Sequence, residues 1–346
     1  MPEKTDIKAL DLAGLGALVS ELGQPGFRAR QLARWLYARG VTSFDEMTDV
    51  PAAMRAALAE RFVVGAPALE TMQTSTDGTR KYLWRLSDGV TVESVGIPAG
   101  DRLTVCFSTQ AGCAMGCTFC ATGQGGLTRS LTSGEMADQV IAVGREFGVR
   151  VSNAVAMGQG EPFAAYDATL GALRILNSAD GAGIGARHLT VSTCGLLPGI
   201  RRFTGEPEQF TLAVSLHSAI QKTRDALMPG VKGYRLAELR AALAAYAETT
   251  GRRPTLEYAL IEGVNDSDRE LVALVRFCSG LLVHVNLIPV NPVAGAGMAR
   301  ASSDRVRAFE RALTLGGTEA SVRAERGADI DAACGQLRQR ARRERG

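Results

Sequence analysis

Three cysteines stand close together in the sequence, Cys113, Cys117 and Cys120, separated by three residues and then by two. Cysteine thiolates hold iron–sulfur clusters, and a four-iron cluster normally takes four of them. Three thiolates would leave one iron without a protein ligand, and that iron could chelate a small molecule through an amine and a carboxylate. The spacing therefore indicates a [4Fe–4S] cluster with one open coordination site.

A structural zinc site is the alternative use of these cysteines, and it would require a fourth ligand. The twelve residues after Cys120 contain neither Cys nor His, and no second pair of cysteines has two residues between its members. We therefore favour the cluster over zinc.

The other four of the seven cysteines stand apart, at Cys106, Cys194, Cys278 and Cys334. Cysteines of a reducing compartment rarely form a structural disulfide framework. An isolated cysteine is usually a small buried apolar residue, and this interpretation suits Cys194 and Cys278.

A second candidate segment is glycine-rich and reads Met-Gly-Gln-Gly-Glu-Pro over residues 157–162. Glycine at Gly160 would let a ligand approach the backbone closely, and the Glu161 carboxylate could accept hydrogen bonds from an ammonium. Such a glycine-rich loop is weak evidence for a ligand-binding site by itself, and the evidence is stronger when the loop directly follows a strand.

These residues fall at or just after predicted strands. Alternating apolar patterns predict strands at 103–109, 153–158, 187–193, 210–217, 254–260 and 282–290. Between them, helical patterns cover 134–147, 168–178, 196–203, 234–250 and 268–279. Repeated β–α units predict a parallel sheet with helices outside it, and six strands suit an incomplete barrel whose chemistry lies at the carboxyl ends of the strands. The length of 346 residues fits such an α/β barrel with an appendage.

The segments before the barrel have a different character. Residues 10–62 are predicted to be helical, with helices at 27–37 and 51–61, and the first carries Arg28, Arg30 and Arg34 on one face. An arginine face of this kind is more often solvated than bound to RNA. Strands at 81–86 and 90–97 flank a turn at 87–89 and predict a β-hairpin extension that contains Glu93.

The composition is that of a globular enzyme, with 46% hydrophobic and 22% charged residues. The most apolar stretch, 281–290, is too short to span a membrane, and the N-terminus lacks the apolar core of a signal peptide, so we expect a cytoplasmic protein with no membrane partner. Residues 338–346 form a basic tail of net charge +4, five arginines against one glutamate, within a total of +3. That total neither proves nor excludes a nucleic-acid partner.

The cysteine spacing after a first barrel strand resembles the radical S-adenosylmethionine (SAM) superfamily. The resemblance implies a cluster that binds SAM at its open iron and cleaves it reductively to a 5′-deoxyadenosyl radical. The segment at 157–162 resembles the glycine–glutamate motif with which that superfamily binds the SAM amino group.

Further segments resemble the RlmN/Cfr family, radical SAM adenine methyltransferases that act on ribosomal RNA. They are 105–113, 214–217, 286–292 and 326–337, and the resemblance runs from about Phe27 to Leu337. It implies methylation of carbon 2 of a specific adenine in large-subunit ribosomal RNA and, for the RlmN type, of a tRNA anticodon-loop adenine. An electron-donor protein is implied as a further partner.

The family mechanism assigns roles to three residues. By resemblance, Cys334 first accepts a methyl group from one SAM, and the radical from a second SAM removes a hydrogen from it. The resulting methylene radical adds to the adenine carbon, and Glu93 removes the proton from the adduct. Cys106 then attacks the Cys334 sulfur, which releases the RNA and leaves a transient disulfide. Two SAM molecules are thus used per turnover.

The resemblance also implies a set of SAM contacts, which are Gly160, Glu161, Ser192, Ser215, Leu216, His217 and Asn291. A structural role in the fold is the alternative for His217. Two positions depart from the family pattern: Gln159 stands where Met is common, and Cys194 where Ser is common.

We expect an α/β fold: an incomplete (β/α)6 barrel with a small N-terminal helical module and a β-hairpin extension. The expected segments are an RNA-binding module at 1–65, the hairpin segment at 66–100, the barrel with its C-terminal cysteine loop at 101–337, and the tail at 338–346. Three alternatives stay open: Cfr-type methylation of carbon 8, a radical SAM enzyme acting on a small molecule, and a zinc-binding RNA protein.

Overall fold

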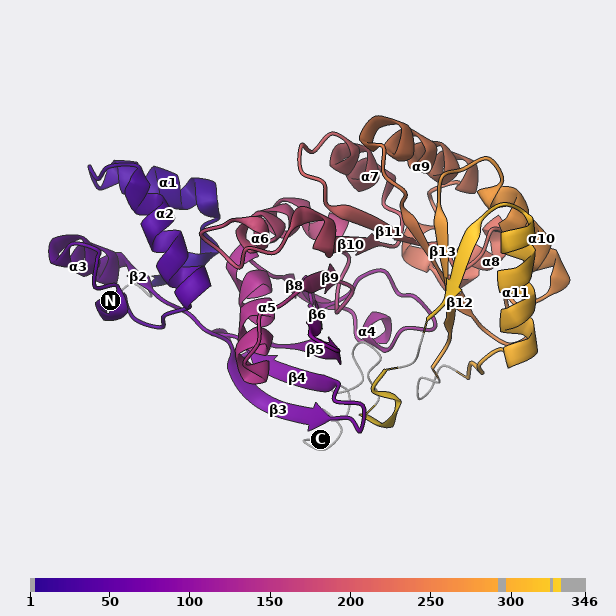
Figure 1. The fold of residues 1–346 in the computed structure, drawn as a ribbon, viewed down its shortest axis with the longest axis horizontal. Coiled ribbons are helices and arrows are strands. Elements are labelled where there is room, and N and C mark those ends of the chain that lie inside the picture. The colour runs from indigo at the N-terminus through magenta and orange to yellow at the C-terminus, as the bar shows by residue number, and fades with distance from the viewer. Residues whose placement is uncertain (1–3, 292–296, 324–325, 331–346) are drawn as a thin grey trace.

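One ten-stranded sheet runs through the computed structural model, which describes residues 4–291, 297–323 and 326–330 (Figure 1). Its strand order is β14-β13-β12-β11-β10-β9-β6-β5-β4-β3, so the sheet is open, with β14 and β3 at its edges. Neighbouring strands from β6 to β14 are parallel, whereas β3, β4, β5 and β6 pair antiparallel. The predicted incomplete barrel is confirmed.

The parallel part of the sheet contains all six predicted strands and one more. Its members are β6 (Arg102–Cys106), β9 (Asn153–Ala156), β10 (Leu189–Thr193), β11 (Thr211–Ser215), β12 (Thr255–Leu260), β13 (His284–Pro289) and β14 (Glu319–Val322). The strand β14 escaped prediction because it is a short, mostly exposed edge strand without a clear alternating pattern.

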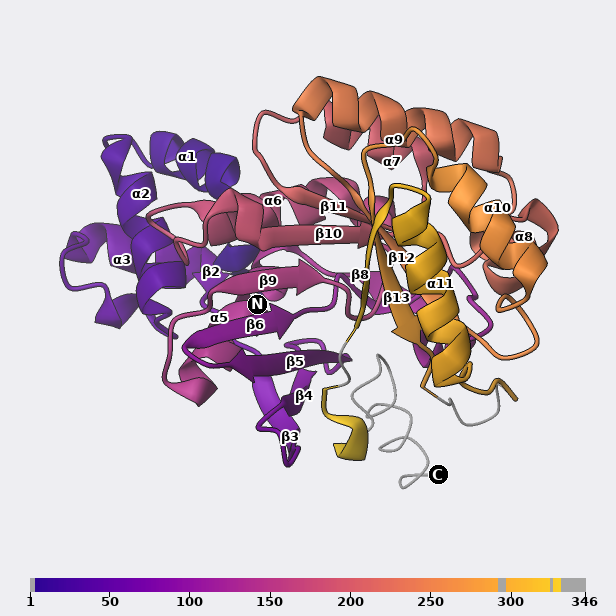
Figure 2. The ribbon, with the colours of Figure 1, turned by 45° about the vertical axis from the view of Figure 1, so that its right-hand side comes forward.

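Helices connect these strands and cover one side of the sheet (Figure 2). They are α5 (Ser133–Phe147), α6 (Tyr166–Asn177), α7 (Leu197–Thr204), α8 (Gln221–Leu227), α9 (Leu236–Thr250), α10 (Asp268–Cys278) and α11 (Ser303–Leu315). Local signals set their ends: α5 begins at a capping box of Thr132 and Glu135 and ends at Gly148, whose φ is 67°. The prediction missed α8 and α11.

The segment before β6 forms three strands rather than the two that we expected. They are β3 (Ala68–Thr74), β4 (Arg80–Arg85) and β5 (Thr91–Ala99), and each pairs antiparallel with the next. Because β5 also pairs with β6, this extension continues the barrel sheet without a break.

An N-terminal helical module lies beside α5 and α6 (Figure 1). It contains α1 (Leu12–Glu21), α2 (Phe27–Ala33), which continues as a π-helical turn to Arg39, and α3 (Ala52–Arg61). The short strands β1 (Thr5–Asp6) and β2 (Phe62–Val63) pair and bring its two ends together. A buried ion pair with an N–O distance of 2.9 Å joins Lys8 of the module to Asp138 of α5.

The strand register gives the sheet two unlike faces. The outer face, toward the helices, carries fully buried apolar side chains such as Val191, Leu212 and Leu256. The inner face carries a polar row, because Ser215, Glu257 and Asn286 are direct partners across β11, β12 and β13. Side chains that pair across neighbouring strands share a face, so ligand-binding groups can gather only on the inner face. In the part of the chain that the structure describes, none of the helices combines the length and apolar character of a membrane span.

Candidate functional site

The cluster cysteines lie in a loop that is closed at its base by a small hairpin. The loop leaves β7 (Gln110–Gly112), contains α4 (Ala121–Gln124) and returns as β8 (Leu127–Ser130), which pairs antiparallel with β7. The amide of Cys113 donates to the carbonyl of Gly126 at 2.9 Å. A Cβ on Gly112 would lie 2.1 Å from the same carbonyl oxygen, so the close approach requires glycine there.

The helix α8 and the turn that follows it hold this loop through main-chain hydrogen bonds. The amide of Thr118 donates to the carbonyl of Leu227 at 3.0 Å, and the amide of Gly230 donates to the carbonyl of Met115 at 2.9 Å. A Cβ on Gly230 would lie 2.7 Å from Met115 Cα. Two residues between the predicted ligands are therefore fixed by a segment more than 100 positions away in the sequence.

The donor set fits an iron–sulfur cluster. All three thiols are partly buried, and burial raises the pKa of Cys113 to about 11 and that of Cys117 to about 12, with a further contribution from the charge of Cys120 in each case. The three sulfur atoms are thus near enough to interact, and positively charged iron would stabilise their thiolate forms.

Glu161 lies buried beside this loop, in the turn after β9. Its Oε1 accepts from the amide of Phe163 at 2.9 Å, and its Oε2 accepts from both the amide and the thiol of Cys194, each at 2.7 Å. Burial raises the pKa of Glu161, and these hydrogen bonds oppose the shift. Gly160 has a φ of 104°, and a Cβ there would meet Gln110 at 2.6 Å, so the backbone can take this path only with glycine.

Cys194 is buried, as we expected of an isolated cysteine, but it is not merely an apolar filler. Its thiol hydrogen bond fixes the carboxylate that the family resemblance assigns to SAM. A serine hydroxyl at this position could donate the same hydrogen bond, which explains how either residue can serve. Cys278 is buried in the apolar core as predicted.

The remaining predicted SAM contacts lie at the carboxyl ends of β10, β11 and β13. Ser192 and Ser215 are on the inner face and half-buried. The side chain of Leu216 lies in the core, so only its main chain could face a ligand. Asn291 is exposed in the loop after β13, beyond the row that the other residues form.

His217 is held in a left-handed conformation, with a φ of 53°, that is unusual for a residue with a side chain. Its Nδ1 accepts from the amide of Ala259 at 2.9 Å, so the ring carries its proton on Nε2. Burial lowers its pKa to about 3, and the charge of Arg224 adds to the shift. The imidazole is therefore neutral at physiological pH, and its ring meets Phe119 of the cluster loop edge-on at 4.7 Å.

Arg224 of α8 is a buried residue for which no sequence motif predicts a role. Its Nη2 donates to the carbonyls of Cys194 at 2.7 Å and Ser215 at 3.4 Å, which ties α8 to the ends of β10 and β11. Only a prediction of α8 itself could have pointed to it.

Glu93 and Cys106 line one small cavity on the inner face. Its walls also include Lys81 of β4 and Gln159 of the loop after β9. The hydroxyl of Ser108 donates to the carbonyl of Glu93 at 2.6 Å and accepts from the amide of Gln159 at 2.9 Å. The structure thus brings together Glu93, Cys106 and the glycine-rich loop, through a serine that the prediction overlooked.

Cys334 lies outside the described residues, as do most of the segment around it and the basic tail. The described part of that segment, 326–330, is fixed to the turn between β3 and β4. Asp329 accepts from the hydroxyl of Ser75 at 2.5 Å and from the amide of Thr76 at 3.0 Å, and Asp77 accepts from the amide of Gly327 at 3.1 Å. The extension therefore holds the chain four residues before Cys334.

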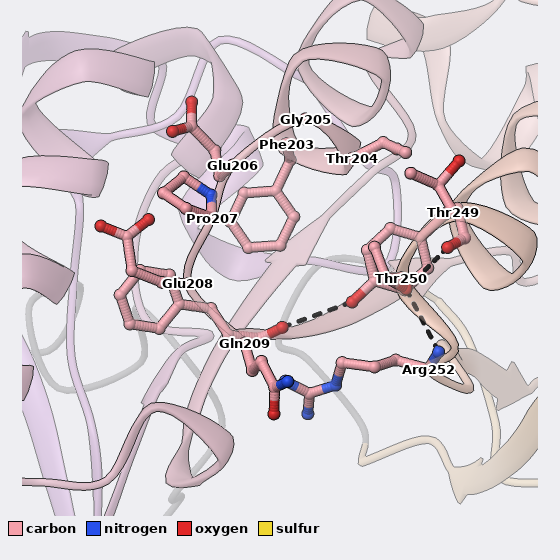
Figure 3. A pocket seen from close by; sticks show the side chains of 12 residues that line it. Phe203, Thr204, Gly205, Glu206, Pro207, Glu208, Gln209, Thr249, Thr250 and Arg252 are labelled. Carbon is pink, nitrogen blue, oxygen red and sulfur yellow. Dashed lines mark hydrogen bonds between the residues drawn. The ribbon is translucent and has the colours of Figure 1, made fainter.

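A larger open pocket lies at the opposite ends of the strands, before β11 and β12 (Figure 3). Its carboxylates Glu206 and Glu208 pair with Arg174 at 3.0 and 2.6 Å, and Arg252 donates to Thr211 at 2.8 Å. The pocket contains none of the predicted site residues, and groups at this end of a barrel usually serve stability.

The contact between Gly230 and the cluster loop predicts that Gly230→Ala displaces the loop and lowers the iron and sulfide content of the reconstituted protein severalfold. Gly233→Ala is the matched control, because a Cβ at Gly233 meets nothing within 4 Å. Iron and sulfide analysis with visible absorption spectra measures the effect. Equal iron content in the two variants would contradict the assigned support.

The two aspartates predict an acid-sensitive attachment of segment 326–330. Hydrogen bonds from Thr79 and then Gly327 hold the pKa of Asp77 below its usual value, and those from Ser75 and Thr76 do the same for Asp329. A depressed carboxyl pKa contributes stability above the ordinary value of 3.8, and that contribution is lost as the pH falls through the folded-state value.

Hydrogen exchange of peptides that cover 75–79 and 326–330 should therefore show protection at neutral pH that disappears in acid. Asp77→Asn should lose much of the protection at neutral pH, whereas Asp101→Asn, in an exposed turn of the same extension, should keep it. Protection that is independent of both pH and Asp77 would rule out this attachment.

Comparisons with known proteins agree with the geometry. The family model of the ribosomal RNA large subunit methyltransferase N-terminal domain matches residues 5–64, and that of the radical SAM superfamily matches residues 107–275. A protein of Symbiobacterium thermophilum named probable dual-specificity RNA methyltransferase RlmN is 47% identical over 98% of this chain and 92% of its own length. The dual-specificity RNA methyltransferase RlmN of an Anaeromyxobacter species is 46% identical over 96% of this chain and 90% of its own length.

A crystal structure of a radical SAM methyltransferase from Sphaerobacter thermophilus is similar to the fold, with a TM-score of 0.89 at 46% identity. The match covers 96% of this chain and 98% of the other. The similarity thus extends over both the N-terminal module and the barrel and is not confined to the shared radical SAM core. The chain therefore belongs to the RlmN family of radical SAM RNA methyltransferases.

Proposed function

We propose that this protein methylates carbon 2 of an adenine in large-subunit ribosomal RNA and of an adenine in a tRNA anticodon loop. The route runs through a methylated cysteine and a transient disulfide. The observation that carries the proposal is the joint placement of Glu93 and Cys106 in one buried cavity. The relatives named dual-specificity RNA methyltransferases support RNA as the substrate.

Cys113, Cys117 and Cys120 would hold the cluster, and the inner face beside Gly160 and Glu161 would hold SAM. When bound, the [4Fe–4S] cluster supplies reductive cleavage of SAM to a 5′-deoxyadenosyl radical, for which an electron-donor protein would provide the electron. Two SAM molecules would be consumed in each turnover, one of them as the methyl donor to Cys334.

The chain's own residues then bind and orient the substrate. Each carboxylate oxygen of Glu161 has more than one lone pair, so the carboxylate can accept from the SAM ammonium while it keeps its hydrogen bonds to Phe163 and Cys194. His217 stays neutral and offers its Nε2 proton as a donor. Ser192 and Ser215 add hydroxyl groups on the same face.

The cavity suits the proton and thiolate chemistry that follows. Carbon 2 of adenine is a poor nucleophile, so a methyl group cannot reach it by simple displacement from SAM, and a cysteine-tethered route meets this difficulty. Glu93 would accept the proton from the tethered adduct, whose unpaired electron would return to the cluster. Cys106 would attack the Cys334 sulfur as a thiolate, and the methylene carbon would leave with the electron pair of the C–S bond and take up a proton to become the methyl group. Both groups are at least nine-tenths buried, which keeps water from the tethered intermediate.

Nucleoside analysis tests the proposal. The reconstituted protein, incubated without oxygen with SAM, a reductant and unmodified ribosomal RNA or tRNA, should form 2-methyladenosine. Cys334→Ala should abolish the product, since the methyl carrier is gone, and Cys278→Ala, in the apolar core, is the control that should retain it. A product of 8-methyladenosine would move the protein to the Cfr type. SAM cleavage without either nucleoside would favour a small-molecule substrate.

We also propose that the N-terminal module binds RNA. Arg30 and Arg34 are both exposed, although Arg34 pairs with Asp180 at 2.6 Å, and the half-buried Arg28 donates to the carbonyl of Asp49 at 3.0 Å. Even so, each guanidinium has five N–H donors, so all three remain able to contact phosphate.

Replacing Arg28, Arg30 and Arg34 by Gln should weaken RNA binding and reduce the salt dependence of the affinity by about one ion per lost phosphate contact. Arg276→Gln, on α10 at the opposite end of the molecule from α2, is the control (Figure 1). Binding curves at several salt concentrations measure the slope, and an unchanged slope in the triple variant would remove the module from the interface.

A further inference from the structure

Lys81 lies in the cavity of Glu93 and Cys106, and it has no part in the chemistry described so far. On β4 it pairs with Val95 of β5, and Val95 pairs with Cys106 of β6. Glu93 is two residues from Val95 and therefore points to the same side of the sheet. Three neighbouring strands thus contribute Lys81, Glu93 and Cys106 to one patch of the inner face.

The burial of Lys81 is unusual for its residue type. Its side chain has no exposed surface, and Glu93 is 3% exposed. Lysine and glutamate are almost never fully buried unless they are paired, because a buried charge without an opposite charge nearby is strongly destabilising. Only five of the 39 cationic residues of the chain are lysines and the rest are arginines. A lysine at this buried position therefore does not follow from a high lysine content, and its compact ammonium differs from the guanidinium that the chain otherwise uses.

The positions also allow mutual contact. Glu93 stands opposite Leu83, two residues along β4 from Lys81, so Lys81 and Glu93 are diagonal neighbours. Diagonal neighbours on an antiparallel pair lie about 7–8 Å apart at Cα, within reach of a long side chain. An ammonium placed there favours the charged forms of both a carboxylate and a thiol.

We propose that Lys81 is a positioning residue whose ammonium holds Glu93 as a carboxylate and Cys106 as a thiolate inside the cavity. The inference rests on the proposed function, since that function is what requires both anions. Lys81 acts through these two groups and does not itself contact the RNA.

Among the described residues, no other charged group lines the cavity. The remaining walls are Ser94, Val95, Gly158 and Gln159, and β9 presents Val155 to Cys106. The next charged side chain along the loop after β9, Glu161, is directed to Phe163 and Cys194. Gln159 is 1% exposed, and its side-chain oxygen Oε1 has no hydrogen-bond partner among the described residues. This oxygen can therefore accept a hydrogen bond from a donor in the cavity.

The rate at which iodoacetamide alkylates Cys106 as a function of pH tests the inference. Peptide mass spectrometry reads the rate for Cys106 alone in the reconstituted full-length protein. Lys81→Met should slow the alkylation about tenfold at neutral pH and move its midpoint about one unit upward, since a tenfold change corresponds to one pKa unit. Lys81→Arg keeps the charge and should preserve most of the rate. Lys222→Met, at an exposed lysine, should match the wild type.

A second measurement covers the case in which Lys81→Met folds poorly. The double variant Lys81→Met/Glu93→Gln removes both charges and should unfold at a higher temperature than Lys81→Met alone, while its Cys106 keeps the slow alkylation. An alkylation profile of either variant that matches the wild type would overturn the inference.

The outcome is separable from that of the proposed function. Alkylation is read without RNA or SAM, so a wild-type protein that fails to methylate RNA would overturn the proposed function and not the alkylation result. If Lys81→Met methylates RNA at the wild-type rate, the positioning role is overturned while the proposed function stands.

Discussion

The register of the parallel strands is the constraint on which the rest of the structure depends. Each hydrogen-bonded pair fixes which side chains share a face, and the sequence supplies fully buried apolar residues such as Val191 and Leu256 to the helix side. The inner face then receives Cys106, Ser192, Ser215 and the other polar groups. A shift of one residue in any strand would exchange the two sets, so burial of the apolar face also protects the site.

The cluster loop adds a second layer of positioning, because it does not belong to the sheet. Its base is closed by β7 and β8, and its middle is fixed to the turn after α8. Arg224 joins α8 to the strand ends, so the loop, the helix and the sheet edge form one connected unit. In a similar way, the antiparallel extension positions residues 326–330 through hydrogen bonds that Asp77 and Asp329 accept.

The sequence patterns predicted the elements whose signals are local. The six predicted parallel strands, five helices of the barrel, two helices of the N-terminal module and the cysteine loop follow from periodicity and spacing over a few residues. The contacts that complete the site are not local: Gly327 meets Asp77 across 250 positions, and Arg224 meets Cys194 across 30. No pattern within either segment signals such a pairing.

Individual side chains show the same limit. In an alternating strand, a lysine such as Lys81 is normally assigned to solvent, but the extension continues the barrel sheet and buries it. An isolated cysteine predicts a small buried residue at Cys194, and its burial is confirmed, whereas its hydrogen bond to Glu161 depends on the turn geometry after two different strands. Chemistry that arises from two distant segments becomes visible only in the fold.

Disulfide mapping after a single turnover tests most directly the claim that Cys106 and Cys334 act as a pair in RNA methylation. The protein would be reduced by an electron-donor protein without added thiol, quenched with an alkylating reagent and digested for peptide mass spectrometry. We expect a peptide linked between Cys106 and Cys334, in an amount that matches the methylated adenine. Methylated RNA formed while both cysteines are recovered as alkylated free thiols would contradict the account.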